Sequence, residues 1–598
     1  MRISSFAGLL LTPMLIMAPE VQRSTGREIS CWTTNSLIKV RPSDPRPATA
    51  SSNMRLYAAR NEFEPFQVVL RAGREGADGV DASASNPVSA NGAVIRGDSV
   101  AIYLERYLDL RVASSVEGSA GEWPDPLVPR VDRYYGERRN AFPFRLRPER
   151  NQPLWIETYI PPGTPAGTYR GSIKITAVDV PEITVPLSVT VWDFDLPSTS
   201  SLRTAYGFSG PAALKQHRGG YTSDRELHQF TNLYSKAALL HRISLYGASM
   251  VPPPFRRTKG GLVVDWTNYD SEVGPLLDGQ VLVGSDPLPG ARATSVDLRT
   301  HNGLVSEEDK ILYWKEWIHH FRERGWLERL YYYLWDEPGK AEYPKVLEKG
   351  RLARRVGPGL RSLLTAPVDP QLEEVVDIWT PLVNCFDIKP GFPDYCEPEL
   401  KRERLEAERL RGKSIWWYQS CGSHGCGGKG GDYFRGLPSY VIDVPGISNR
   451  IMPLLAWKYR IGGELYYNTN EAFSRSENPW KDVYLYGGNG DGTLFYPGKP
   501  GLIGGSKDIP IESIRLKLIR EGLEDYEYLF LLWRNSSASS IDARISSVAT
   551  KTYSWNPDPA ILLSIRQAIG DSLSGGFHSR SMPNPFLDTS AERHDSKP

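Results

Sequence analysis

Two adjacent acids, Asp336 and Glu337, are the residues of this 598-residue sequence whose types and position best suit catalysis. They follow a run of apolar and aromatic residues at 330–335, which predicts a buried strand, and Pro338 stops that strand. A residue before proline favours an extended backbone, so we expect both acids at the carboxyl end of the strand. In a parallel α/β barrel, catalytic side chains emerge at that end. Capping of a following helix is the simpler explanation of an isolated Asp-Glu-Pro.

Aromatic residues stand at the ends of three later predicted strands. They are Trp379, the run Trp416-Trp417-Tyr418-Gln419, and the run Tyr466-Tyr467-Asn468. Each of these alone is more often a packing residue than a functional one. Flat amphipathic rings suit the faces of sugars, and we expect these strand ends to meet Asp336 and Glu337 at one mouth. The sequence therefore predicts a sugar-binding cleft.

The elements that must position these residues alternate between strands and helices over residues 198–535, which predicts a parallel sheet. A helix that begins near Ser306 and ends near Gly325 leads into the strand that carries the acids. Eight β/α units fit a (β/α)8 TIM-like barrel, with the acids on its fourth strand. The predicted strands are 202–208, 243–246, 295–298, 330–337, 362–366, 375–379, 414–418 and 464–467.

Residues 25–197 have a different pattern, in which short stretches alternate apolar and polar residues. Apolar residues occupy the odd positions from 183 to 191, and glycine and proline separate the stretches densely. This pattern predicts an antiparallel β-sandwich that precedes the barrel. We interpret the sandwich as a support for the barrel, with carbohydrate binding as the alternative.

The C-terminal part is expected to contain two helices and a tail. Residues 511–534 predict a long helix that closes the barrel. Residues 536–598 are expected to form one more helix at 561–573 and a disordered tail from Gly575.

Composition excludes several classes of function. Lys plus Arg total 71 and Asp plus Glu total 70, so the chain has no field to attract nucleic acid or an anionic membrane. No stretch approaches about 18 apolar residues, so we expect no transmembrane segment. Arg2, an apolar run at 6–17 and Ala18 resemble a secretory signal peptide over residues 1–24. We therefore expect a secreted or periplasmic protein; the alternative is a disordered or mis-started leader.

Five cysteines are present, and an oxidising compartment would allow two pairs of them to join. Cys385 is near Cys396 in the sequence and Cys421 is near Cys426, which predicts two short-loop disulfides. The stretch around His424 can also be interpreted as a metal loop. Three candidate ligands without a second cluster at zinc-finger spacing make that the weaker interpretation. We expect no metal and no cofactor.

Several motifs in this order resemble those of glycoside hydrolase family 123. They are Ala59-Arg-Asn-Glu62 with Gln67-Val-Val-Leu70, Trp335-Asp-Glu-Pro338, Trp416-Trp-Tyr418, Gly490-Asp-Gly-Thr-Leu-Phe-Tyr-Pro497, Ser513-Ile-Arg515 and residues 518–528. The resemblance covers about residues 55–532. It implies a β-sandwich before a barrel, β-N-acetylgalactosaminidase activity on a glycan, and Asp336 and Glu337 as the catalytic pair. Tyr467-Asn468 stands where we expect a tryptophan, which leaves the identity of the sugar open.

Two neighbouring acids on one strand end are poorly placed to flank a sugar from opposite faces, as two-carboxylate glycosidases require. They suit a retaining exo-β-N-acetylhexosaminidase in which the substrate assists: the oxygen of its 2-acetamido group attacks the anomeric carbon. Glu337 protonates the leaving oxygen and later activates water. Asp336 accepts the acetamide N–H and stabilises the positive charge that develops.

The remaining roles are assigned from strand-end position alone. Tyr418 is the candidate donor to the acetamide oxygen. Further candidates for contact with the sugar are Trp417 and Trp379 as walls, together with Trp335, Tyr467 and Asn468. The sequence is also compatible with two other functions: a non-catalytic carbohydrate-binding or surface protein, and a glycosidase acting on a sugar without an acetamide.

Overall fold

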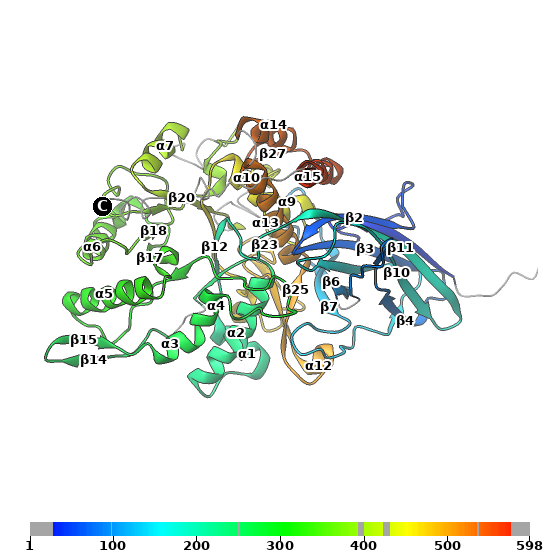
Figure 1. Ribbon diagram of the computed structural model, residues 1–598, viewed down its shortest axis with the longest axis horizontal. Coiled ribbons are helices and arrows are strands. Elements are labelled where there is room, and N and C mark those ends of the chain that lie inside the picture. The colour runs from blue at the N-terminus through cyan, green and yellow to red at the C-terminus, as the bar shows by residue number, and fades with distance from the viewer. Residues whose placement is uncertain are drawn as a thin grey trace, which may run out of the picture.

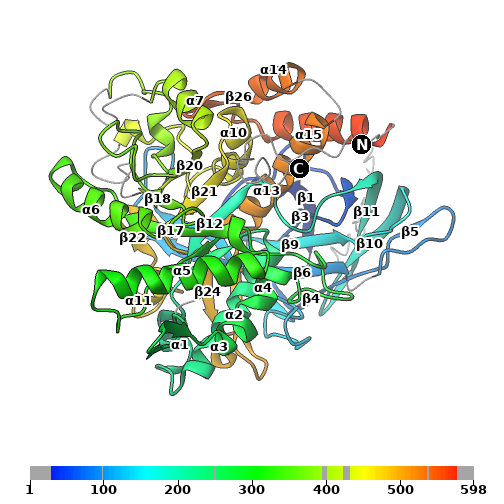
Figure 2. The same ribbon diagram turned by 60° about the vertical axis from the view of Figure 1, so that its left-hand side comes forward.

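The computed structural model describes residues 28–96, 99–247, 251–392, 400–421, 431–534 and 538–575. These residues form an N-terminal body of two mostly antiparallel sheets and a second body with an eight-stranded parallel sheet surrounded by helices (Figures 1 and 2). The predicted leader at 1–24 and the tail after Gly575 lie outside the described residues.

The N-terminal sandwich confirms the prediction made from the alternating pattern. In β11 (Val180–Asp195), Val185, Leu187 and Val189 are buried, whereas Thr184 and Pro186 are exposed. The first sheet has the order β1 (Ile29–Asn35), β3 (Glu62–Ala72), β9 (Asn151–Ile160), β6 (Val100–Leu110), β7 (Gly121–Pro129), β25 (Ile509–Ser513) and β24 (Phe495–Gly498). The second has the order β2 (Met54–Arg60), β11, β10 (Gly167–Ala177), β4 (Ala77–Ala84) and β8 (Phe144–Leu146).

The last two strands of the first sheet come from the C-terminal half of the chain. β25 pairs antiparallel with β7 and with β24. Residues 511–513, predicted as the start of a long helix, therefore belong to a strand, and that part of the prediction is wrong. The helix α13 (Ile514–Trp533) starts after them because the Ser513 hydroxyl caps it, accepting from the Leu516 N–H at 3.1 Å.

The barrel contains all eight predicted strands, and every neighbouring pair is parallel. β13 and β16 stand at the two ends of the strand order. The Asp297 carboxylate at the end of β16 accepts from the Gly247 N–H after β13 at 3.1 Å, which nearly closes the ring. The order is β13 (Leu245–Tyr246), β12 (Arg203–Gly207), β21 (Gly463–Tyr466), β20 (Ser414–Tyr418), β19 (Ile378–Trp379), β18 (Ser362–Leu364), β17 (Leu330–Trp335) and β16 (Val296–Asp297).

Helix α5 (Glu307–Glu323) forms where the sequence predicts it. The Ser306 hydroxyl caps it by accepting from the Asp309 N–H at 3.1 Å, and Gly325 follows its end with a φ of 69°. Trp314 and Phe321 are buried on the face that packs towards the barrel. Other helices around the barrel are α1 (Gly210–Arg218), α2 (Asp224–Leu240), α6 (Tyr343–Arg354), α7 (Arg402–Leu410), α9 (Gly446–Arg450) and α10 (Met452–Lys458).

Helix α13 lies between the barrel and the sandwich (Figure 1) and is buried along nearly its whole length. Its charged side chains reach both bodies. Lys517 and Arg520 pair with Glu157 of β9 at 3.1 and 2.7 Å, and Asp525 pairs with Arg450 of α9 at 2.7 Å. Burial of these charges is tolerated because each has an opposite charge in contact.

Two further helices follow α13. The helix predicted at 561–573 is present as α15 (Pro559–Ser574). A helix that was not predicted, α14 (Ala538–Val548), precedes it. Among the helices of the described ranges, none combines the length and apolar character needed to cross a bilayer.

Candidate active site

The acid pair lies directly after β17, the fourth barrel strand in chain order, as predicted. One carboxylate oxygen of Asp336 accepts from the Tyr333 hydroxyl at 2.8 Å and from the hydroxyl of Thr365, the residue after β18, at 3.2 Å. Burial raises the pKa of Tyr333 well above its ordinary value, so this hydroxyl stays a donor. Two neighbouring strands therefore orient the Asp336 carboxylate.

Glu337 is held by β18 and β20. Its backbone N–H donates to the Thr365 hydroxyl at 2.9 Å, and its carboxylate accepts from the Tyr418 hydroxyl at 2.5 Å. Its φ is 44°, so the extended backbone predicted from Pro338 is wrong. A side chain in this left-handed region is strained, and such strain concentrates at functional sites. Thr365 and Tyr418 hold Glu337 in that conformation.

Tyr418 and Trp417 face opposite sides of the barrel wall because successive strand residues alternate. Tyr418 packs in the cluster inside the barrel, whereas Trp417 packs outside, edge-on to Phe386 with ring centroids 5.4 Å apart. Trp379 is also outside, where its indole N–H donates to Glu408 of α7 at 2.9 Å. The structure therefore does not bring Trp417 and Trp379 to the mouth as walls of a sugar site.

Trp335 ends β17 and also faces outwards. Strict alternation after Tyr331 and Tyr333, which are inside, would put Trp335 inside as well. The register between β17 and β18 is irregular between Tyr333 and Trp335, and this reverses the side on which Trp335 lies. Its ring contacts α6, where the Lys349 ammonium is 5.1 Å from the ring centroid.

Tyr467, just after β21, is linked through its backbone to the aromatic side chains near Asp336. Its backbone carbonyl accepts from the Tyr246 hydroxyl at 2.9 Å, and the Tyr246 ring meets Tyr333 edge-on with centroids 6.3 Å apart. The Tyr467 hydroxyl donates to Asp491 at 3.1 Å. Burial raises the pKa of Asp491 to about 6, although the tyrosine hydroxyls that donate to it oppose the rise. Tyr467 is thus fixed from both ends.

Asn468 shapes the turn after β21. Its side-chain amide donates to Glu471 at 2.5 Å, and its side-chain oxygen accepts from the Thr469 N–H at 2.8 Å. The same oxygen accepts from the Asn470 N–H at 3.1 Å, and this second bond closes the Asx-turn that asparagine favours in loops. Asn468 therefore has a structural role here that its strand-end position alone did not indicate.

Four residues that contribute to the site were not singled out from the sequence. Thr365 had a usable signal, because it directly follows a predicted strand. Tyr333 and Tyr246 required knowledge of which face of each strand points inwards. Asp491 stands in the quoted 490–497 motif, but its contacts with β21 depend on the fold.

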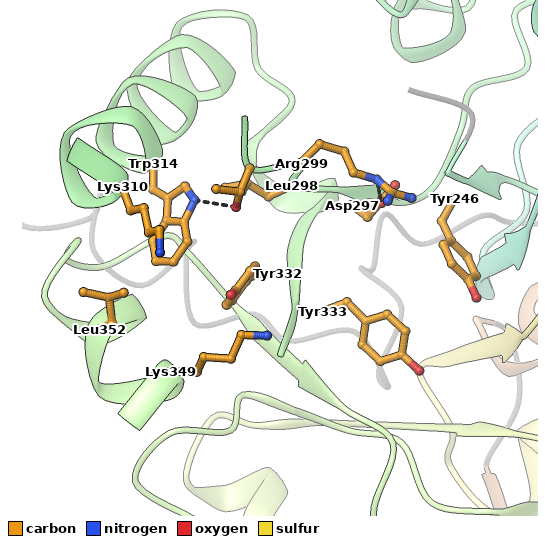
Figure 3. A pocket seen from close by; sticks show the side chains of 11 residues that line it. Tyr246, Asp297, Leu298, Arg299, Lys310, Trp314, Tyr332, Tyr333, Lys349 and Leu352 are labelled. Carbon is orange, nitrogen blue, oxygen red and sulfur yellow. Dashed lines mark hydrogen bonds and ion pairs between the residues drawn. The ribbon is translucent and has the colours of Figure 1, made fainter. Parts of the chain in front are cut away.

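A cleft of about 480 Å³ is lined by Tyr333, the residue whose hydroxyl donates to Asp336 (Figure 3). Tyr333 and Tyr246 line its inner end, and α5 and α6 line its outer end. Tyr333 therefore connects the acid pair to a hollow large enough for part of a sugar chain.

The predicted disulfides are partly described. Cys385 and Cys421 are each disulfide-bonded, and Cys31 has a free thiol. The predicted partners, Cys396 and Cys426, lie outside the described residues, as does His424. Within the described part of the chain, no group of three or more His, Cys, Asp or Glu side chains could hold a metal ion.

Known structures show a related fold. A family 123 glycoside hydrolase from Clostridium perfringens, studied for glycolipid glycan hydrolysis, matches with a TM-score of 0.64 at 15% identity, covering 91% of this chain and 98% of that one. A family 39 glycoside hydrolase from Bacteroides cellulosilyticus WH2 has a TM-score of 0.31 at 12% identity, covering 74% and 81%. The latter likeness is too low to support an argument. No curated protein sequence matches this chain.

Family models match both bodies. The model of the glycoside hydrolase 123 catalytic domain matches residues 310–532, which include Asp336, Glu337 and Tyr418. The model of the glycoside hydrolase 123 N-terminal domain matches residues 35–177 of the sandwich. Sandwich and barrel occur in the order that the sequence motifs imply, and the chain belongs to glycoside hydrolase family 123.

Proposed function

We propose that this glycoside hydrolase is a retaining exo-β-N-acetylhexosaminidase, with β-linked N-acetylgalactosamine as the first sugar to test. The observation that carries the proposal is the different anchoring of the two adjacent acids. Asp336 is oriented by Tyr333 and Thr365, whereas the carboxylate of Glu337 is bound by Tyr418. Thr365 also accepts from the Glu337 backbone, but the two carboxylates have different partners and can take different roles in one reaction.

In the proposed reaction the substrate supplies its own nucleophile. The 2-acetamido oxygen attacks the anomeric carbon while Glu337 gives its proton to the leaving glycosidic oxygen, which breaks the C1–O bond and forms an oxazoline-type intermediate. Glu337 then takes a proton from water, and that water attacks C1 and opens the ring. Asp336 accepts from the acetamide N–H and offsets its positive charge. Two inversions at C1 give net retention.

The positions of other acids support this mechanism over one with a protein nucleophile. Acids at or after the ends of other barrel strands have partners of their own. Examples are Asp297 paired with Arg299, Asp369 accepting from Tyr343, and Glu471 paired with Arg475. A conventional second carboxylate would have to leave such a partner to reach the sugar.

Tyr418 has a second proposed role. Its hydroxyl donates to Glu337 here, whereas its sequence position suggested donation to the acetamide oxygen. We propose that it orients Glu337 before the substrate binds. The relative from Clostridium perfringens was studied for glycolipid glycan hydrolysis, so glycolipid glycans are a natural class to test.

The test is a panel of four chromogenic β-glycosides, of N-acetylgalactosamine, N-acetylglucosamine, galactose and glucose. We expect cleavage of N-acetyl sugars only, and inhibition by a thiazoline analogue of the intermediate well below substrate concentrations. Asp336→Asn should lose most of the activity, because an amide cannot offset positive charge. Equal cleavage of the plain galactoside would favour a glycosidase acting without acetamide assistance. Binding of these sugars without cleavage would favour a carbohydrate-binding protein.

A further inference from the structure

The cleft at Tyr333 is lined by residues from both sides of the barrel wall. β16 pairs with only the first two of the six residues of β17, so the rest of β17 has no strand beside it on that side. The cleft of about 480 Å³ lies along this stretch and runs from Tyr333, beside Asp336, to Lys310 of α5 and Lys349 of α6 (Figure 3). A sugar held at Asp336 can therefore extend a substituent towards these two helices.

The outer end of the cleft carries two positive charges without a counter-charge. Within the described residues, neither Lys310 nor Lys349 forms an ion pair with a carboxylate. The Lys349 ammonium donates to the Leu334 carbonyl at 3.1 Å, which fixes its direction. Burial lowers the pKa of Lys349, and the positive charge of Lys310 lowers it further. The two ammonium groups are thus close enough to repel each other, and an anion between them would relieve that repulsion.

The neighbouring charges do not neutralise the lysines. The third cation of the cleft, Arg299, is paired with Asp297. The exposed fraction of the arginine side chain is 38%, whereas that of the aspartate side chain is 7%. The arginines of α6 and its C-terminal end turn away from the cleft to their own acids: Arg351 with Glu374, Arg354 with Asp377, and Arg355 with Glu307. The cleft therefore keeps a net positive charge beside a proposed catalytic carboxylate.

We propose that this cleft binds an anionic substituent, a sulfate ester or a carboxylate, carried by the sugar whose glycosidic bond is cut. The inference rests on the proposed function. Glu337, the group assigned to the leaving oxygen, is held from β20 by Tyr418, whereas the cleft opens on the side of Tyr333 and β16. The bound anion therefore lies on the non-reducing side of the glycan, and Lys310 and Lys349 select acidic glycans.

The experiment compares 4-nitrophenyl N-acetyl-β-galactosaminide with its 3-, 4- and 6-O-sulfated forms and with carboxymethyl ethers at the same oxygens. For at least one sulfated or carboxylated position we expect kcat/KM about tenfold above that of the uncharged glycoside, falling as salt is added. Comparison of the sulfated with the carboxymethylated glycosides shows whether the cleft prefers a sulfate ester or a carboxylate. In Lys310→Gln with Lys349→Gln, the ratio of charged to uncharged kcat/KM should fall to about one. The matched control, Lys315→Gln with Lys345→Gln, changes exposed lysines of the same helices and should keep the wild-type ratio.

A binding arm separates failure of the anion site from failure of the proposed reaction. Calorimetry measures the affinity of the Glu337→Gln protein for free N-acetylgalactosamine and for its O-sulfated forms, so no turnover is needed. Tighter binding of a sulfated sugar that is lost in the two-lysine variant supports the anion site even if no glycoside is cleaved. Hydrolysis without any preference for charged sugars, or a preference that survives the two-lysine variant, would overturn the inference and leave the proposed reaction standing.

Discussion

The Tyr418 hydroxyl donates to the Glu337 carboxylate across 2.5 Å, and this contact joins two strands that are three positions apart in the barrel. β20 thereby sets the direction of a carboxylate that β17 carries. Thr365, which directly follows the intervening strand β18, also binds the backbone N–H of Glu337. The strained residue is therefore fixed at both its backbone and its side chain. Such fixing is what a proton donor needs in order to meet one particular oxygen of a substrate.

Glu337→Gln tests the proton-transfer role directly. The amide keeps the shape and can still accept from Tyr418, but it cannot donate a proton to the leaving oxygen. We expect turnover of a glycoside with a poor leaving group, such as an alkyl or sugar aglycone, to fall by ~10²–10⁴-fold. A dinitrophenyl glycoside, whose leaving group needs no proton, should lose much less in the glycosylation step. Burst kinetics separate the two steps.

The matched control for this change is Glu348→Gln, on the exposed face of α6. It should keep the wild-type rate with both leaving groups. An equal loss with good and poor leaving groups in Glu337→Gln would mean that Glu337 acts by positioning or charge and not as the acid.

Tyr333→Phe tests whether the hydroxyl that orients Asp336 matters for the transition state. Hydrogen bonds to charged groups contribute about 1.5–3 kcal/mol, so we expect kcat/KM to fall about tenfold or more. The dissociation constant of the thiazoline inhibitor should rise by a larger factor than KM does, because Asp336 is proposed to act on the charged intermediate.

Tyr331→Phe is the control on the same strand. Its hydroxyl is buried inside the barrel and has no hydrogen-bond partner in the described part of the chain. Its loss should therefore change neither kcat/KM nor the affinity for the thiazoline inhibitor. If both variants lose inhibitor affinity equally, the effect belongs to packing of β17 and not to the contact with Asp336.

The barrel was predictable because each strand is a short apolar run between helical patterns. Such a run can be recognised from the local sequence without knowing which strands pair with it. The acid pair was predictable because it directly follows such a run. Trp417 and Trp379 show the limit of this reasoning: their strand-end position was correct, but which face points inwards is set by the register of the closed sheet. An irregularity as local as that between Tyr333 and Trp335 reverses the face.

The junction of the two bodies was not predictable for a different reason. β24 and β25 extend a sheet of the sandwich, although more than three hundred residues separate β25 from β7 in the chain. The local sequence of these strands does not indicate which strand they pair with. The prediction of helix at 511–513 failed because apolar residues in β25 continue the pattern of α13. Ser513, a good cap, was the one local signal for the true start.

Peptide mapping of the unreduced protein tests the cysteine pairs. We expect one linked peptide joining Cys385 to Cys396 and another joining Cys421 to Cys426. Burial raises the pKa of Cys31 to about 12, so its thiol should resist alkylation near pH 8 until denaturant is added. A peptide joining Cys385 to Cys421 would contradict the proposed pairs, and rapid labelling of Cys31 in the native protein would contradict its raised pKa.

Glu464→Gln should change how stability depends on pH. Glu464 is buried in β21, where Tyr206 and Tyr440 donate to one of its oxygens, and burial raises its pKa from 4.5 to about 7. Between these values the folded protein keeps a proton that the unfolded chain has released, so this group makes stability fall as pH rises through the window, by at most about 3 kcal/mol. Glutamine mimics the protonated acid, so the thermal midpoint of the variant should fall less between pH 5 and 7.5 than that of the wild type. A parallel fall in both proteins would mean that Glu464 ionises in the folded state at its ordinary pKa.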